Sequence, residues 1–267
     1  MEFLKTIKRR SFLSEVVYIT LNIGLAVILM FIIRSTGSLW MAFAMVLLSQ
    51  WRVFAVRPRF WFAHIQANLL GTIVSISFVV FLYVVNTANV SSLEILSTQI
   101  FLSLLYIIWL VFIKPQSKRV YIIIQASIAL FSGITAIYYM SYSWVASPVV
   151  ALVWLVGYST ARHILGNYNE ESHTTLLSII WGLMFAEIGW LAYHWVIAYR
   201  LPLASTLLLP QISIIVLCFG FLGYKIYDSY AHHQKIRLND VLLPIFFSIS
   251  IIGILIFVFN SVNTGIV

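Results

Sequence analysis

Long apolar segments constrain the fold of this chain more than any other feature. A helix needs roughly 20 apolar residues to cross the hydrocarbon core of a bilayer, and nine segments come close to that length. We expect them at residues 16–33, 39–56, 62–85, 93–113, 120–140, 144–161, 175–199, 205–227 and 241–260. Apolar residues make up 62% of the chain and charged residues only 9%, so a water-soluble domain of this size would expose large apolar patches. The sequence therefore predicts a polytopic transmembrane protein.

The same segments predict an all-α fold. Backbone groups in hydrocarbon must bond within the protein, which leaves helices and closed barrels, and barrel strands alternate apolar with polar residues. The segments of this chain are continuously apolar instead. We expect a transmembrane helical bundle of eight or nine spans that forms one domain over residues 16–260, preceded by a basic segment at 1–15 and followed by a short tail at 261–267.

The basic residues indicate how the bundle is inserted. If the N-terminus is cytoplasmic, 14 of the 16 Lys and Arg residues lie on the cytoplasmic side, and only Arg34 and Arg200 lie outside. This distribution follows the positive-inside rule. We therefore expect a cytoplasmic N-terminus in a plasma (inner) membrane and, after nine crossings, an external C-terminus. The net charge of +8 is explained by this anchoring and by attraction to anionic lipids, so no nucleic-acid partner is expected.

A weak internal repeat is also present. Four residues between Trp40 and Leu48 recur 104 positions later, between Trp144 and Leu152. A parallel duplication of four helices plus one extra span would explain them, as in transporters built from repeats. Four matches among common residue types also arise by chance, so both explanations stay open.

Glu187 is the sharpest candidate for a functional residue. It lies in the middle of the expected span 175–199, about 18 Å from either end at 1.5 Å per residue. An acid at the bilayer centre costs roughly 2.5–3.5 kcal/mol, so it usually faces water, has a partner or carries a proton. His194 lies seven residues further on, near the same helix face. Together they would form a proton or cation pathway.

Two structural interpretations stand beside that pathway. A protonated Glu187 would bond an amide on another helix, at Asn22, Gln99, Gln125 or Gln211. Gly182, Ala186 and Gly189 form a small-residue face on the same segment. Such a face lets another helix approach closely, within the chain or in a homo- or hetero-oligomer.

An arginine-rich connection is the second candidate site. Arg52, Arg57 and Arg59 alternate with aromatic residues between two spans, and His64 follows about one turn later. Guanidinium groups bind phosphate through paired hydrogen bonds, so this turn would hold an anionic lipid headgroup or a polyprenyl pyrophosphate. The alternative is a positive-inside anchor with an aromatic belt.

Histidines and acids recur in two cytoplasmic connections, 162–174 and 228–240, but their spacing matches no metal motif. The adjacent His232 and His233 would point apart on a helix. We therefore expect no metal and no cofactor, and no catalytic motif is present.

Three functions remain open. The first is a small transporter or permease-like protein that uses Glu187 and His194. The second is a non-catalytic membrane subunit or scaffold. The third is a lipid-headgroup-binding protein or lipid-linked membrane enzyme that uses the arginine turn.

Overall fold

The computed structural model describes residues 12–51, 57–168, 173–194, 197–201 and 204–259. This part of the chain contains nine α-helices, of which eight are long and apolar enough to cross a membrane. The helices are α1 (Phe12–Thr36), α2 (Leu39–Ser49), α3 (Trp61–Asn86), α4 (Ser92–Ile108), α5 (Arg119–Met140), α6 (Ala146–Leu165), α7 (Thr174–Tyr193), α8 (Gln211–His233) and α9 (Leu238–Phe257). A π-helical turn, Trp109–Ile113, extends α4. The predicted all-α transmembrane bundle is confirmed.

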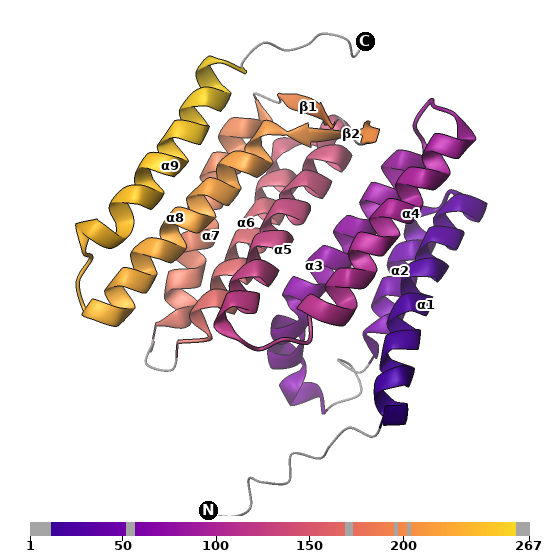
Figure 1. Ribbon diagram of the computed structural model, residues 1–267, viewed down its shortest axis with the longest axis horizontal. Helices are drawn as coiled ribbons and strands as arrows, with labels where there is room; N and C mark the ends of the chain where they lie inside the picture. Colours follow the sequence, from indigo (N-terminus) through magenta and orange to yellow (C-terminus); the bar gives the residue numbers. More distant parts are fainter. Residues whose placement is uncertain (1–11, 52–56, 169–172, 195–196, 202–203, 260–267) are drawn as a thin grey trace, which may run out of the picture.

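The helices lie side by side and alternate in direction, so α1 begins and α9 ends at opposite ends of the bundle (Figure 1). Most of the described basic residues gather at one of these ends, which we call the basic end. They are Arg57, Arg59, Lys114, Lys118, Arg119, Arg162, Lys225, Lys235 and Arg237. The opposite end carries Arg34 and Arg200, and the sorting of charge expected from the sequence is therefore consistent with the helix order.

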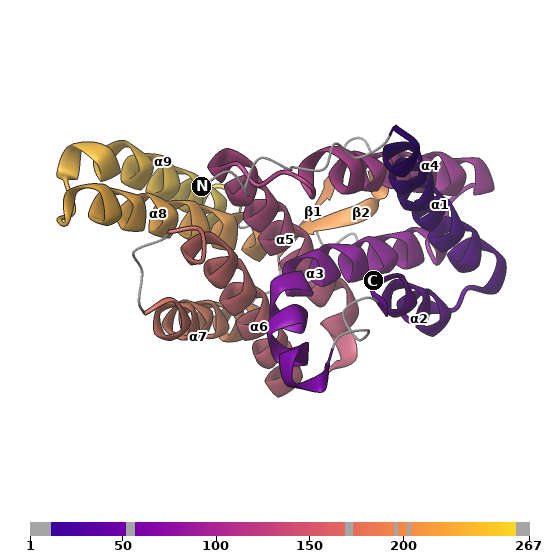
Figure 2. The ribbon, with the colours of Figure 1, turned by 90° about the horizontal axis from the view of Figure 1, so that it is seen from below.

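The middle of the bundle is formed by α3 and α5, with α1, α2 and α4 on one side and α6 to α9 on the other (Figure 2). The core contains apolar side chains such as Val79, Leu82, Ile134 and Val153, all fully buried. The outer faces are apolar as well. On α9, Leu243 is 76% exposed and Phe246 is 64% exposed, which is the pattern of a helix that lipid surrounds.

The small-residue face of α7 packs within the chain, against α6. A Cβ added at Gly182 would lie 3.0 Å from Trp154, and one added at Gly189 would lie 2.9 Å from Val153. The approach is tighter still at Gly157 of α6, because an added Cβ would lie 2.5 Å from Phe185. These glycines let the two helices approach closely. The oligomer and the four-helix duplication both stay predictions.

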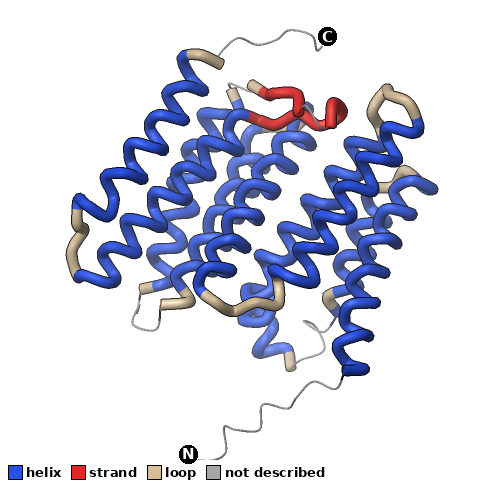
Figure 3. The backbone as a smooth tube through the Cα atoms, viewed as in Figure 1, coloured by secondary structure: helices blue, strands red, loops and turns tan. Residues whose placement is uncertain are grey.

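One departure from the expected spans concerns residues 198–210. They form an antiparallel hairpin, β1 (Ala198–Leu201) and β2 (Ala204–Pro210), at the end of the bundle opposite the basic end (Figure 3). We call this the hairpin end. The expected span 205–227 is therefore wrong by about six residues at both ends, since α8 begins after Pro210. Proline has no N–H for a helical bond, so it favours the start of a helix over its interior.

The hairpin also shortens the preceding helix. The helix in the expected span 175–199 ends six residues early, because α7 stops at Tyr193.

The helix in the second expected span, 39–56, is also short. It is α2, which has only 11 residues and covers about 16 Å at 1.5 Å per residue.

Hydrogen bonds fasten the helices together at the hairpin end. The side-chain amide of Gln211 donates to the Leu255 carbonyl of α9 at 2.7 Å, and its backbone N–H donates to Ile197 at 2.7 Å. The Tyr138 hydroxyl of α5 donates to the Gly189 carbonyl of α7 at 2.7 Å. These contacts join α5, α7, α8 and α9 on the side of the membrane where the hairpin lies.

Candidate functional site

A cavity of about 320 Å³ lies between α5, α6, α7 and α8. Its walls are almost entirely apolar, and α5 and α6 contribute the deepest residues, such as Ala126, Leu130 and Ala161. Aromatic residues form much of the remaining wall, namely Trp181, Phe221, Tyr224, Tyr227 and Tyr230. The volume falls at the lower end of the range for small-molecule sites.

The cavity opens sideways, between α7 and α8. Ile180, Phe221, Tyr230 and Ile236 line it and are also exposed on the outer surface, so they form its mouth. Most of the lining residues lie in the half of their helix nearer the basic end, whereas Leu130, Leu217, Gly220 and Phe221 lie beyond the middle of theirs. At that end α7 and α8 stand apart (Figure 2). The mouth therefore faces the lipid of a single leaflet.

Trp181 bridges the gap between α7 and α8. Its ring lies directly over Gly223 of α8, where an added Cβ would come within 1.6 Å of Cη2. The ring also meets Phe185 edge to face at 5.4 Å between centroids. The absence of a side chain at Gly223 therefore allows the indole of Trp181 to form part of the cavity wall.

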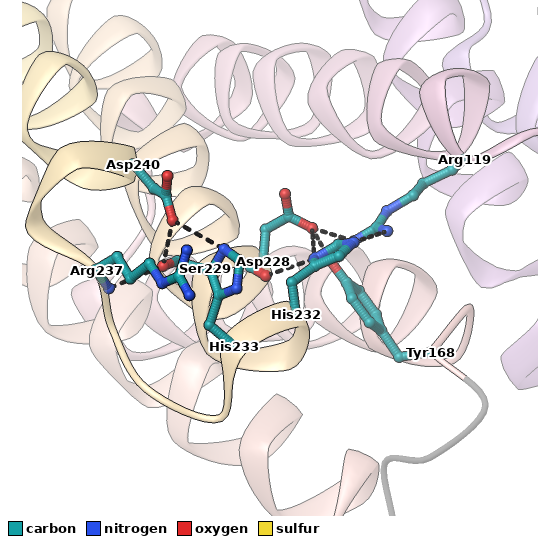
Figure 4. A network of polar contacts seen from close by, with 8 residues as sticks. All are labelled: Arg119, Tyr168, Asp228, Ser229, His232, His233, Arg237 and Asp240. Carbon is teal, nitrogen blue, oxygen red and sulfur yellow. Dashed lines mark hydrogen bonds and ion pairs between the residues drawn. The ribbon is translucent and has the colours of Figure 1, made fainter.

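A polar cluster borders the cavity at the basic end (Figure 4). Arg119, the first residue of α5, forms an ion pair with Asp228 of α8 and donates to the hydroxyl of Tyr168. Tyr168 in turn donates to Asp228 at 3.0 Å. The ring of Tyr168 packs edge to face against Tyr227 at 4.8 Å, and Tyr227 lines the cavity. Three separate elements therefore meet where the apolar wall ends.

The electrostatics of this cluster keep Tyr168 neutral. Burial, which disfavours the phenolate, raises the pKa of Tyr168 to about 12, and the carboxylate of Asp228 acts in the same direction against the opposing effect of Arg119. The phenol thus carries its proton at neutral pH. It accepts a hydrogen bond from the guanidinium and donates one to the carboxylate.

The hydrogen bonds also assign the tautomer of His232. Its Nδ1 lies 2.8 Å from the backbone carbonyl of Asp228, which can only accept, so Nδ1 carries the hydrogen. In the neutral ring Nε2 is then an acceptor, and it faces Nη1 of Arg119 at 3.4 Å. The imidazole extends the cluster toward the surface, where 53% of its side chain is exposed.

His233 belongs to a separate group. Its Nε2 lies 3.5 Å from Asp240, which accepts a hydrogen bond from Ser229 at 3.0 Å. His232 and His233 thus contact different carboxylates, although their ring centroids are only 6.4 Å apart. Among the residues that the structure describes, no three His, Cys, Asp or Glu side chains come together as a metal site.

Glu187 is exposed on the outer face of α7, and the expected depth of this residue is corrected. Because α7 ends at Tyr193, Glu187 lies six residues, or about 9 Å, from the end of the helix instead of about 18 Å. The amides proposed as its partners bond elsewhere. Gln99 contacts Asn86, Gln125 contacts His163, Gln211 contacts Leu255 and Asn22 contacts Tyr18.

His194 follows at the end of α7, where its ring is exposed and meets Trp190 and Tyr193 edge to face at 5.2 and 5.4 Å. This aromatic surrounding is typical of the membrane interface. The structure records no contact between His194 and Glu187. Their role in a proton or cation pathway stays a prediction.

The arginine turn lies at the basic end. Arg57, Arg59 and His64 are exposed, and the guanidinium of Arg59 stacks over Phe60 at 4.5 Å from the ring centroid. Arg52 lies outside the described residues. Headgroup binding by these four residues stays a prediction.

The cavity and its polar cluster were missed in the sequence. Arg119 and Asp228 are 109 positions apart, and Tyr168 lies between them in the α6–α7 connection. The only signal was a charged residue at the boundary of each of two apolar segments, which is equally typical of simple anchoring. Comparison with known proteins yields no match, whether with family models, curated proteins or solved structures.

Proposed function

We propose that this membrane protein binds an amphipathic, lipid-like molecule in the cavity between α5 and α8. The apolar body of the molecule would occupy the cavity, and a hydrogen-bonding end group would meet the cluster around Arg119 and Tyr168. The observation that carries this proposal is the position of the cavity. It opens sideways toward lipid, and it ends at polar side chains on the basic side.

The energetics favour an amphipathic ligand over a purely apolar one. Lipid tails are as apolar as the cavity walls, so moving a hydrocarbon chain from the bilayer into the cavity gains little from the hydrophobic effect. Selective retention must come from shape and from the polar end. The cluster supplies a partly exposed guanidinium and a partly exposed imidazole at that point, and aromatic walls favour a flat or unsaturated body.

We assign the basic end to the cytoplasmic side of a plasma membrane. The support is the charge bias of the whole chain, which follows the positive-inside rule. With this orientation the cavity opens to the inner leaflet.

The test is to identify and displace the bound molecule. Protein extracted with its surrounding lipid is analysed by native mass spectrometry, for the wild type and for Ala161→Phe, which places a ring in the cavity. Ala151→Phe is the matched control, because Ala151 is an exposed residue of the same helix and lines a different, more open cavity. We expect a retained molecule in the wild type and the control, and its loss in Ala161→Phe. Equal retention in both variants would refute the proposal.

A transport role is the second candidate. It is favoured by one observation, an acidic side chain on a membrane-spanning helix with no hydrogen bond or ion pair to any described residue. It would require water or a partner chain to reach the outer face of α7. Proton-coupled flux in reconstituted vesicles tests it, and unchanged flux in Glu187→Gln would end that assignment.

A further inference from the structure

A second cavity lies on the opposite face of α6, between α3, α5 and α6 at the basic end. Its volume is about 450 Å³. It differs from the first cavity in its lining, which includes Gln66, Tyr158, Arg162, His163 and Asn167. No carboxylate is among the described residues that line it. Within this described lining the one formal charge is the guanidinium of Arg162, so the lining is suited to an anion.

The neighbouring hydrogen bonds fix the protonation of His163. The amide nitrogen of Gln125 donates to the backbone carbonyls of Ile113 at 2.7 Å and Gln116 at 3.0 Å. The amide oxygen of Gln125 must therefore be the atom that faces Nε2 of His163, at 2.9 Å. Because an amide oxygen only accepts, Nε2 carries the hydrogen. Nδ1 of the neutral ring is left as an acceptor, and no described residue donates to it.

Arg162 and Tyr158 supply donors to the cavity. Nη1 of Arg162 donates to the hydroxyl of Thr175 at 2.7 Å, which leaves the other N–H groups of the guanidinium for a ligand. The hydroxyl of Tyr158 accepts a hydrogen bond from Gln66, so its own hydrogen remains available. The cavity thus combines one cation and a hydroxyl donor with an imidazole acceptor, and the amides of Gln66 and Asn167 add further polar atoms to its lining.

We propose that this cavity binds a hydroxylated phosphate ester, such as the headgroup of a glycerol- or sugar-bearing phospholipid. Arg162 pairs with the phosphate, and Nδ1 of His163 accepts a hydrogen bond from a ligand hydroxyl. A guanidinium matches the geometry of phosphate oxygens, and a neutral imidazole acceptor discriminates in favour of a ligand that can donate. The site is separate from the cavity of the proposed function, since the two line opposite faces of α6.

The location supports a ligand that comes from the membrane surface. Ala63 and Ala67 of α3 line the cavity and are exposed. His64 lies beside Ala63 in the sequence, and Arg59 lies about one turn before Ala63. The basic residues singled out in the sequence therefore lie next to the rim of the cavity, where they would raise the local concentration of an anion.

Binding is measured with the full-length protein in detergent micelles, with short-chain phosphatidylglycerol, short-chain phosphatidylcholine and soluble glycerol phosphate as probes. We expect phosphatidylglycerol to bind at least tenfold more tightly than phosphatidylcholine, whose headgroup has no hydroxyl. Binding of glycerol phosphate alone would identify a soluble ester as the ligand, and binding of phosphatidylglycerol alone would identify a lipid. Either result supports the proposal. Equal affinity for the two lipids, or binding of none of the three probes, overturns it.

Three variants separate the site from general surface charge. Arg162→Gln should weaken binding about tenfold or more, because a charge-assisted hydrogen bond is lost. Arg237→Gln is the control, since it removes the same charge from the same end but outside the cavity. His163→Phe removes the Nδ1 acceptor, together with the N–H toward Gln125, so preference for phosphatidylglycerol should fall toward one while binding through Arg162 persists. Equal effects of Arg162→Gln and Arg237→Gln would overturn the assignment.

A further variant keeps the test valid if Arg162→Gln does not fold. Ala67→Phe obstructs the cavity from the exposed side of α3 and removes no polar group. It should abolish the preference for phosphatidylglycerol. Unchanged preference in a folded Ala67→Phe protein would overturn the proposal.

Discussion

Substitution of Gly223 by alanine should separate α7 from α8. An added Cβ would lie 1.6 Å from Cη2, 2.3 Å from Cζ2 and 2.6 Å from Cζ3 of Trp181. The indole is rigid, so the whole ring must rotate away and give up its edge-to-face contact with Phe185. Overpacking of this kind costs about 1–3 kcal/mol. The gain in helix propensity from glycine to alanine, about 1 kcal/mol, offsets part of that cost.

The matched control is Gly253→Ala on α9, where an added Cβ has no atom within 4 Å. This variant receives the propensity gain without the clash, so the two variants should differ in free energy of unfolding by about 1–3 kcal/mol. For chains of this size the difference corresponds to a gap in Tm of about 2–12 °C. Thermal unfolding in one detergent, followed by circular dichroism, measures it.

The same variant has a second consequence. The displaced ring of Trp181 has the adjacent cavity as its nearest free space, so Gly223→Ala should also reduce retention of the bound molecule. If both alanine variants melt at the same temperature, Trp181 does not lie over α8 and the wall of the cavity is incorrectly described.

Three further predictions follow from individual contacts. Tyr138→Phe removes the buried hydrogen bond to Gly189 and should lower the free energy of unfolding by about 0.6–1.7 kcal/mol in a membrane setting; an unchanged unfolding midpoint in a denaturant titration would contradict it. Glu187→Leu should leave stability equal or higher in lipid bilayers, because the acid is exposed on the outer face of α7. A marked loss of stability, measured against Glu187→Gln, would show that the acid has a partner. Reporter tags on the two termini should lie on opposite sides of the membrane. If both tags lie on the same side, one of the nine helices does not cross the membrane.

The helices were predictable because lipid imposes a simple requirement on sequence. Each span must be apolar over most of its length, and charged residues must gather at its ends. The hairpin was not predictable in the same way. Leu207, Leu208 and Leu209 continue the apolar character of α8, so hydropathy alone gives no boundary, and only Pro210 marks the place where the helix begins.

The sequence also contained a signal for the outward position of Glu187, which the argument from its depth in the membrane did not use. Gly182, Ala186 and Gly189 mark the face of α7 that packs on α6. At 100° per residue, Glu187 lies about 130° from the centre of that face. In a helix surrounded by apolar neighbours and lipid, hydrophobic periodicity does not indicate which side faces the protein. A small-residue face therefore predicts which side of such a helix another helix covers.

The candidate cavities could not be predicted from the sequence, because each is lined by residues from three or more helices. Arg119 and Asp228 each look like an anchoring charge until α5 and α8 are placed side by side. The assignment of Nδ1 of His163 as an acceptor depends on Gln125, whose amide is oriented by the carbonyls of Ile113 and Gln116. Such sites follow from the packing, and packing in a bundle of uniformly apolar helices is set by shape more than by pattern.

The two ends of the bundle differ in how firmly they hold the helices together, and this difference bears on ligand exchange. At the hairpin end, α7 and α8 are joined by a paired hairpin, and Gln211 and Tyr138 add hydrogen bonds to α9 and α7. Toward the basic end a cavity lies between the same two helices, and Trp181 contacts α8 over Gly223, near the middle of that helix. Few buried contacts and low local packing favour local opening. A molecule entering the cavity between α7 and α8 would therefore meet least resistance at the basic end, where α7 can move relative to α8 while the hairpin acts as the fixed point.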